Sequence, residues 1–273
     1  MSEKKALVTV LIGEFHQQLW AQHFQPTWEP YAKAHGYDIV VIDDYIDPSP
    51  RSRDRRPHWQ KCLILEHEQV RDYDSVVWID GDVAINHHRA PCIVEAHNSD
   101  LVGALSYGQV LKYEDGYSVL ESRLNQALEG QFRHRTIPEH YTDAGLPGDV
   151  DDWTNTGVLV LKPRLHRDLL RTVYDGYQET PMSMADNMPL SYHLFKNKSV
   201  KPLDPRFNCD ILYALLDHYP FIVWPSVRDN QRIRSMVANA IWGNNFFIHY
   251  TGGLGRDFRM DIRFVRTENS GIF

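Results

Sequence analysis

The sequence predicts an α/β fold in which a mostly parallel sheet is flanked by helices. Short apolar runs recur at residues 6–12, 37–43 and 75–79, and stretches suited to helices separate them. Such alternation is typical of parallel strands, which need a crossover connection between them. Acidic residues follow the second and third runs directly, and ligands of these sheets bind beyond the carboxyl ends of the strands.

The first half of the chain alternates strands and helices. In chain order we predict a strand at Ala6–Ile12, a helix from near Phe15 towards His35, a strand at Tyr37–Asp43, a helix at Trp59–Val70 and a strand at Ser75–Ile79. Pro26 and Pro30 are expected to break or kink the first helix, and Gly36 to end it. An arginine-rich loop covers residues 48–57.

The second half begins with a polar segment, residues 106–152, that lacks clear periodicity apart from a candidate helix at Tyr117–Glu129. We interpret it as an insertion over the ligand-binding edge of a single domain, residues 1–273, on the side of an acceptor substrate. Beyond it we predict a strand at Thr156–Leu161, helices near Arg164–Tyr177 and Ala185–Lys196, and strands at Pro220–Trp224 and Phe246–Tyr250.

Composition excludes several classes of protein. The 273 residues are 42% hydrophobic and 24% charged, as in soluble globular proteins, and the net charge of -7 argues against a nucleic-acid partner. Three cysteines without metal-type spacing favour a reducing, cytoplasmic location. No apolar stretch approaches a transmembrane span, although the arginine loop and a basic C-terminal stretch leave peripheral contact with an anionic membrane open.

Asp80-Gly81-Asp82 follows an apolar strand directly. Two carboxylates one residue apart can turn towards one divalent cation, and the glycine permits the tight backbone that this needs. The plain alternative is a surface turn, but the position at a strand end favours a metal site.

His249 ends the last predicted strand and precedes Gly252 and Arg256. An imidazole there could complete a metal site, and mixed carboxylate and imidazole ligation suits Mn²⁺. Arg256 could hold a diphosphate, since guanidinium matches phosphate geometry. The alternatives are a core histidine bonded to backbone and a solvated arginine.

Three further positions carry candidate polar groups. Lys61 on a helix could bind phosphate or a sugar hydroxyl, Asn155 could bind sugar hydroxyls, and Asp186-Asn187 would place a carboxylate beside the reacting sugar carbon. A solvated lysine, a turn asparagine and an ordinary helix start are the alternatives.

Together these motifs resemble the glycosyltransferase A-type (GT-A, Rossmann-like) fold, and specifically the retaining families that include glycogenin and the lipopolysaccharide glycosyltransferases. The segment Trp78–Asn86 also resembles fungal and plant galactosyl- and xylosyltransferases. Three departures, Ser183, Asn187 and Arg256-Asp257-Phe258, leave the donor sugar unspecified.

The resemblance implies a role for each candidate. Asp80, Asp82 and His249 would bind Mn²⁺ or Mg²⁺, and Lys61 and Asn155 would contact the donor sugar, with Asp186 and Asn187 near its anomeric carbon. Gly252 and Arg256 would lie at the diphosphate. The nucleoside would lie against Thr9, Val10, Leu11, Asp43 and Asp44.

The expected activity is transfer of a sugar from a nucleotide-sugar donor, UDP-linked in these families, to a hydroxyl of a glycan, glycolipid or other acceptor, with retention of configuration. Two rivals stay open. One is a nucleotidyltransferase, although Ile12-Gly13-Glu14 lacks the glycine-rich basic loop of that class. The other is a sugar-nucleotide-binding protein without catalysis.

Overall fold

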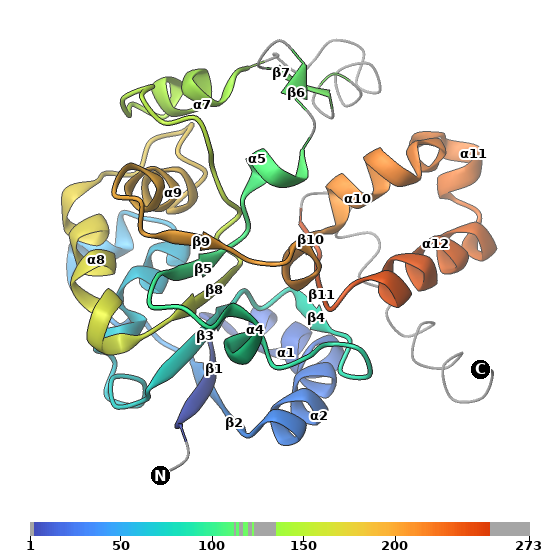
Figure 1. Cartoon of the computed structure of the whole chain (residues 1–273). Coiled ribbons are helices and arrows are strands. Elements are labelled where there is room, and N and C mark those ends of the chain that lie inside the picture. Colours follow the sequence, from blue (N-terminus) through green and yellow to red (C-terminus); the bar gives the residue numbers. More distant parts are fainter. Residues whose placement is uncertain (1–2, 112, 115–116, 120–121, 123–134, 252–273) are drawn as a thin grey trace.

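A six-stranded sheet forms the centre of the protein (Figure 1). The computed structural model describes residues 3–111, 113–114, 117–119, 122 and 135–251. Across the sheet the strands are β2 (Tyr37–Ile42), β1 (Lys5–Val10), β3 (Ser75–Ile79), β8 (Val158–Leu161), β5 (Val102–Ala104) and β9 (Val200–Pro202). Only β8 among them runs against its neighbours, which confirms the predicted mostly parallel sheet.

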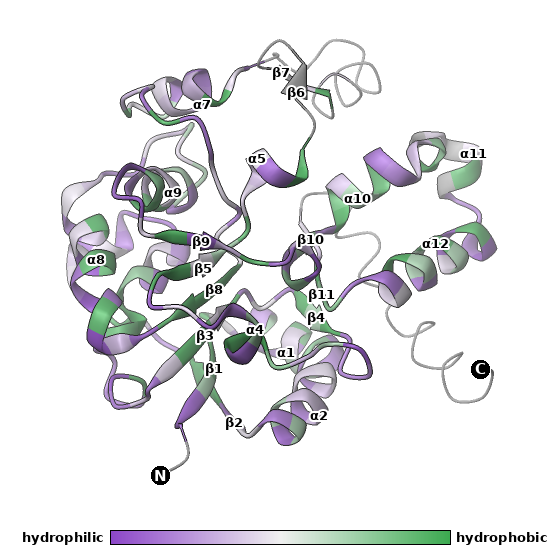
Figure 2. Cartoon of the chain, in the orientation of Figure 1, coloured by the Kyte–Doolittle hydropathy of each residue, from purple (hydrophilic) through white to green (hydrophobic). Residues whose placement is uncertain are grey.

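Both faces of this sheet are buried. Along β1, Leu7 packs into one hydrophobic cluster, whereas Ala6 and Val8 pack into another on the opposite face. Successive strand residues point to opposite faces, so a strand covered on both sides reads as one continuous apolar run. This is why β1, β2, β3 and β8 were recognisable in the sequence, whereas β5 and β9, with three residues each, were not predicted. Figure 2 shows the central strands as hydrophobic.

Helices cover both faces of the sheet. One face carries α1 (Glu14–His23), α2 (Gln25–His35) and α4 (Ile93–His97), and the other carries the 3₁₀ helix η1 (Pro57–Glu66), α8 (Pro163–Gly176) and α9 (Asn187–Lys196). The short helix α3 (Pro50–Arg53) lies within the arginine loop.

A small second sheet positions the candidate site. Its order is β10 (Cys209–Asp210), β11 (Phe247–His249) and β4 (Val83–Ile85), with β11 parallel to β10 and antiparallel to β4. The 3₁₀ helix η2 (Pro205–Asn208) leads into β10. Next to this sheet are α10 (Ile211–His218), η3 (Pro220–Val223), α11 (Pro225–Arg228) and α12 (Gln231–Asn244), which extend away from the main sheet (Figure 1).

The described part of residues 106–152 contributes to a separate hydrophobic cluster. The segment includes α5 (Tyr107–Val110), the hairpin of β6 (Tyr113–Glu114) and β7 (Tyr117–Ser118), and α7 (Ile137–Asp143). Side chains of α5 and α7 form a third hydrophobic cluster with Trp153 and with Met188 of α9. The predicted helix Tyr117–Glu129 begins in strand β7, and most of it lies outside the described residues.

One prediction holds in part and two others need correction. The expected helix at residues 15–35 is broken near Pro26, as predicted: α1 and α2 meet at Phe24, Pro26 lies in the first turn of α2, and Gly36 ends α2 at φ 68°, whereas Pro30 lies inside α2 without breaking it. Residues 57–66 form a 3₁₀ helix instead of an α-helix. The strand predicted at Pro220–Trp224 was wrong: the run forms the 3₁₀ turn η3, where the proline sits in the first turn and lacks the N–H that a strand would need.

Among the described residues no helix is both long and apolar enough to cross a membrane.

Candidate metal centre

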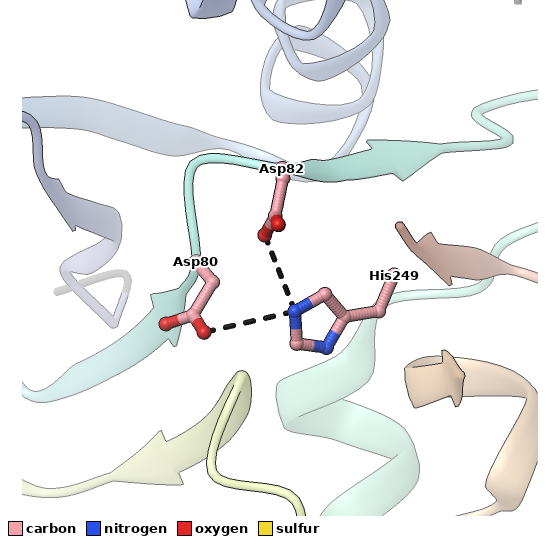
Figure 3. A group of neighbouring side chains, drawn as sticks. All are labelled: Asp80, Asp82 and His249. Atoms are coloured by element: carbon pink, nitrogen blue, oxygen red, sulfur yellow. Dashed lines mark ion pairs between the residues drawn. The ribbon is translucent and has the colours of Figure 1, made fainter. Parts of the chain in front are cut away.

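Asp80, Asp82 and His249 converge at the carboxyl edge of β3 (Figure 3). One ligand atom of each lies within 4.8 Å of the others. His249 Nε2 is 3.2 Å from Asp82 Oδ1 and 3.7 Å from Asp80 Oδ2. The structure therefore brings together the three residues that were predicted as metal ligands, from two different sheets.

Backbone hydrogen bonds hold these three residues in place. The Asp80 N–H donates to the Gly157 carbonyl over 2.8 Å, and the Tyr250 N–H donates to the Asp82 carbonyl over 3.1 Å. His249 pairs with Val83 across β11 and β4. The turn between β3 and β4 is thus tied both to β8 and to the strand that carries the histidine.

Gly157 has no side chain, and the imidazole of His249 fills the space that a Cβ at this position would take. A Cβ at this position would lie 2.1 Å from His249 Cε1 and 2.4 Å from Nδ1, far inside van der Waals contact. The Asn155-Thr156-Gly157 motif therefore needs its glycine for close packing against the histidine.

Asn208 orients the imidazole. The Nδ1 of His249 is 3.2 Å from Asn208 Oδ1, which leaves Nε2 facing the two carboxylates. The ring is buried, with 4% of its surface exposed. Burial lowers the pKa of His249, but the attraction and hydrogen bond of Asp82, and the charge of Asp80, outweigh burial and raise it to about 9. Without a metal the ring is therefore protonated at neutral pH.

The Asp80 carboxylate is held by Trp78 and Lys61 through the oxygen that does not face His249. Its Oδ1 accepts a hydrogen bond from Trp78 Nε1 over 2.8 Å and lies 3.4 Å from Lys61 Nζ. The other oxygen, Oδ2, faces His249. Neighbouring donors of this kind fix the orientation of a metal ligand.

Lys61 and Asp186 form a buried ion pair beneath Asp80. The Lys61 ammonium lies 3.1 Å from Asp186 Oδ2 and donates to Thr156 Oγ1 over 3.0 Å. Each side chain is 2% exposed. Burial alone would lower the pKa of Lys61, but Asp186 and Asp80 raise it above its usual value, so the ammonium stays charged.

Asn155 and Asn187 hold the loop before β8. Asn155 accepts from the Gly157 N–H over 2.8 Å and donates to Asp210 Oδ2 over 3.3 Å. Asn187 accepts from the Thr156 N–H over 2.9 Å and donates to the Thr154 carbonyl over 3.0 Å. Their predicted contacts with a donor sugar stay predictions.

A cavity of about 400 Å³ opens beside the two carboxylates. Its walls include Val10 and Leu11, whose contact with a nucleoside stays a prediction. Trp78, Asp80, Gly81, Asp82, Phe15, His16 and His58 also line it. Thr9 is fully buried in β1, and Asp43 and Asp44 are exposed after β2 without lining this cavity. Gly252 and Arg256 lie outside the described residues.

Sequence reasoning missed Asn208, Asp210 and Trp78. Asn208 and Asp210 lie where η2 meets the two-residue strand β10, and no periodic pattern indicates either element. Trp78 was assigned to a buried strand, but the hydrogen bond of its indole has no signal in the sequence.

No protein-family model and no curated protein matches this sequence, whereas solved structures do. A glycosyltransferase involved in glycosylation of the major capsid of PBCV-1 aligns with a TM-score of 0.55 and 14% identity, over 96% of this chain and 100% of that one. The apo structure of the bifunctional glycosyltransferase WbbM aligns at 0.51 and 15%, over 96% of this chain and 50% of that one. The galactosyltransferase LgtC, bound to donor and acceptor sugar analogs, aligns at 0.47 and 13%, over 98% and 97%. The first two alignments confirm the predicted GT-A-like fold.

Proposed function

We propose that this protein is a metal-dependent glycosyltransferase that transfers a sugar from a UDP-linked donor to a hydroxyl acceptor with retention of configuration. One observation carries the proposal: two carboxylates and an imidazole converge beside a cavity of about 400 Å³ in a fold that glycosyltransferases share. The cavity is large enough for a small-molecule ligand.

The donor set fits a divalent cation. Carboxylate oxygens with one imidazole nitrogen suit Mn²⁺, with Mg²⁺ as the second choice. When bound, such an ion would supply Lewis-acid stabilisation of the departing diphosphate. Asp80, Asp82 and His249 would hold it, and Trp78 and Asn208 would orient two of these ligands.

The Lys61–Asp186 pair suggests a role in addition to the predicted ones. Because its ammonium also reaches Asp80, the pair links the metal ligand to the start of α9. We propose that this link sets the position of Asp80. Action of Asp186 at the anomeric carbon stays a prediction, as does its role as nucleophile or as a stabilising charge.

We propose that the reaction takes place in a reducing compartment such as the cytoplasm. All three cysteines are free thiols, and two of them are buried. Protein thiols persist unpaired where the surroundings are reducing. The proposed partners are a nucleotide-sugar donor and a glycan, glycolipid or other hydroxyl acceptor.

The nucleotidyltransferase alternative is less well supported. That class holds phosphates with a glycine-rich basic loop after the first strand, whereas here Gly13 is followed by Glu14 in the first turn of α1. A carboxylate at this helix start repels phosphate.

A panel of UDP-sugars with and without Mn²⁺ tests the proposal. We expect release of UDP from at least one donor only when Mn²⁺ is present, and a loss of about 100-fold or more in Asp82→Asn, because the variant removes the negative charge of a metal ligand. Asp72→Asn is the matched control. The carboxylate of Asp72 is exposed, precedes the start of β3 and does not line the cavity. Binding of a UDP-sugar without turnover would favour the non-catalytic alternative, and formation of UDP-sugar from a sugar phosphate would favour the nucleotidyltransferase.

A further inference from the structure

A second cavity, of about 240 Å³, lies between α5 and α10. The rings of Tyr107 and Tyr213, one from each helix, are 5.2 Å apart between centroids. Figure 1 shows the two helices on either side of the start of β10. Leu105, Leu111, Asn208, Cys209, Asp210 and Ala214 form much of the remaining wall.

This cavity adjoins the candidate metal centre. Asn208 lines it and also holds the imidazole of His249. Asp210 lines it and pairs with His249 across β10 and β11. Asn208 and Asp210 therefore lie between the second cavity and His249, one of the three predicted ligands.

The buried carboxylate of Asp210 in the wall already has hydrogen-bond partners. Asp210 Oδ2 accepts from the Tyr107 hydroxyl over 3.0 Å and from Asn155 Nδ2 over 3.3 Å. Its Oδ1 accepts from the Leu212 N–H over 3.0 Å and from the Thr251 hydroxyl. A carboxylate has about four acceptor positions, so Asp210 has little capacity left for a ligand.

The Asn208 amide has partners as well: its nitrogen donates one hydrogen to the Asn155 carbonyl over 3.1 Å, and its oxygen lies 3.2 Å from His249 Nδ1. Burial raises the pKa of the Cys209 thiol to about 12, so this side chain is neutral at physiological pH. A polyhydroxylated sugar ring would therefore find few hydrogen-bond partners here, whereas an apolar group would meet leucine, alanine and tyrosine surface.

Charged side chains lie around this apolar wall. Arg206 and His218 are exposed and line the cavity, and Asp217 is half-buried beside His218. An occupant with an apolar end and a polar remainder matches this arrangement. The volume also fits, since an apolar cavity of about 150 Å³ already accepts benzene.

We propose that this cavity binds an aromatic ring of the acceptor, at a distance from the hydroxyl that receives the sugar. The inference rests on the proposed function and narrows its acceptor to compounds that carry an aryl group away from the reacting hydroxyl, such as aryl glycosides.

Filling the cavity tests this proposal. Ala214→Phe places a ring into it from α10, and Val110→Trp narrows it from a position that is 39% exposed and therefore tolerant of a larger side chain. Ala240→Phe on α12 is the matched control, because Ala240 is also half-buried but does not line the cavity. The probes are a panel of 4-fluorophenyl glycosides and the same sugars without the aryl group, observed by ¹⁹F NMR and by transfer assays with Mn²⁺ and UDP-sugar.

We expect at least one aryl glycoside to bind wild type and Ala240→Phe equally, and at least tenfold more weakly to Ala214→Phe and Val110→Trp. Mn²⁺-dependent hydrolysis of UDP-sugar in the absence of acceptor should be unchanged in all variants. The proposal is overturned if no aryl glycoside binds wild type, or if the filled variants bind equally well. Failure of the proposed function is a separate result, because UDP-sugar turnover would then be absent in wild type while aryl binding still depends on position 214.

Discussion

The charge of His249 depends on whether a metal ion is bound. Its pKa of about 9 in the metal-free protein means that a divalent ion must displace a proton at neutral pH. Apparent Mn²⁺ affinity should therefore rise about tenfold per pH unit between pH 7 and 9 and level off above pH 9. Anaerobic titrations followed by Mn²⁺ EPR would measure this dependence.

The control for this titration is His249→Gln, which keeps a polar side chain but has no proton to release. Its Mn²⁺ affinity should be weaker and nearly independent of pH over the same range. A wild-type profile as flat as that of the variant would show that Mn²⁺ does not bind through His249.

Gly157 offers a second test at single-residue scale. In Gly157→Ala the new methyl group would lie 2.1 Å from His249 Cε1, so the imidazole must move. We expect at least a tenfold loss of Mn²⁺ affinity, because the ligand geometry is disturbed. Gly243→Ala in α12 has no atom within 4 Å of the added carbon and should leave Mn²⁺ binding intact. Equal calorimetric titrations of the two variants would contradict the packing argument.

Asp80, Asp82 and His249 were predictable because each lies at or beside the end of a buried strand, where side chains reach ligands. Asn208 was not, because its function depends on a histidine 41 positions away. A sequence pattern reports local burial and turn chemistry, whereas the partner of a side chain is decided by the assembled sheets.

At the scale of elements, length decided what could be predicted. β1, β2 and β3 have five or six residues and carry clear apolar runs. In the small sheet, β10 and β4 have two and three residues, too few for any periodicity, and neither was predicted, whereas β11 lies within the apolar run Phe246–Tyr250 that was predicted as a strand. The apolar run at Pro220–Val223 resembled this run but forms a 3₁₀ turn, since proline favours a first turn over a strand interior.

The arginine loop, residues 48–57, also has a structural role that its composition did not indicate. Arg55 Nη1 donates to the Tyr174 carbonyl over 2.8 Å, and Arg51 Nη2 donates to the Tyr174 and Asp175 carbonyls, each over 3.0 Å. These carbonyls end α8 and would otherwise lack partners. Arg51 and Arg55 therefore cap a helix, so their presence in the loop is no evidence for an anionic acceptor.

The ion pair between η1 and the start of α9 yields a prediction at this scale. Lys61→Met should lower the free energy of unfolding by about 3–5 kcal/mol, because it leaves Asp186 charged and buried without its partner. The double variant Lys61→Met/Asp186→Leu should recover most of that loss. Urea denaturation of the metal-free proteins measures both effects.

Activity of the same double variant separates structural from chemical roles. If Asp186 acts at the donor sugar, UDP-sugar turnover stays lost although stability returns. Recovery of turnover together with stability would exclude a chemical role of Asp186 and would show that the position of Asp80 does not depend on the Lys61–Asp186 pair. A double variant as unstable as Lys61→Met would contradict the account of the pair itself.

Across the whole molecule, the small sheet joins two cavities of different chemistry. The larger one borders the carboxylates after β3, and the smaller one borders Asn208 and Asp210 behind His249. The first suits a charged nucleotide with its metal and the second an apolar group. Both cavities include residues beside the imidazole of His249. A ligand in one cavity should therefore affect ligand binding in the other cavity through the position of His249.

Ligand-induced stabilisation tests this arrangement in the intact protein. UDP that binds with Mn²⁺ at 100 times its Kd should stabilise the native state by about 2.7 kcal/mol, which corresponds to a rise in Tm of roughly 5–10 °C for a chain of this size. Differential scanning fluorimetry should show this shift only when both ligands are present, because Asp80 and Asp82 would repel an uncompensated diphosphate. Asp82→Asn should lose the shift, and Asp72→Asn should keep it. An equal shift by UDP without Mn²⁺ would show that the nucleotide binds elsewhere or without the ion, and the metal–diphosphate site at Asp80 and Asp82 would have to be abandoned.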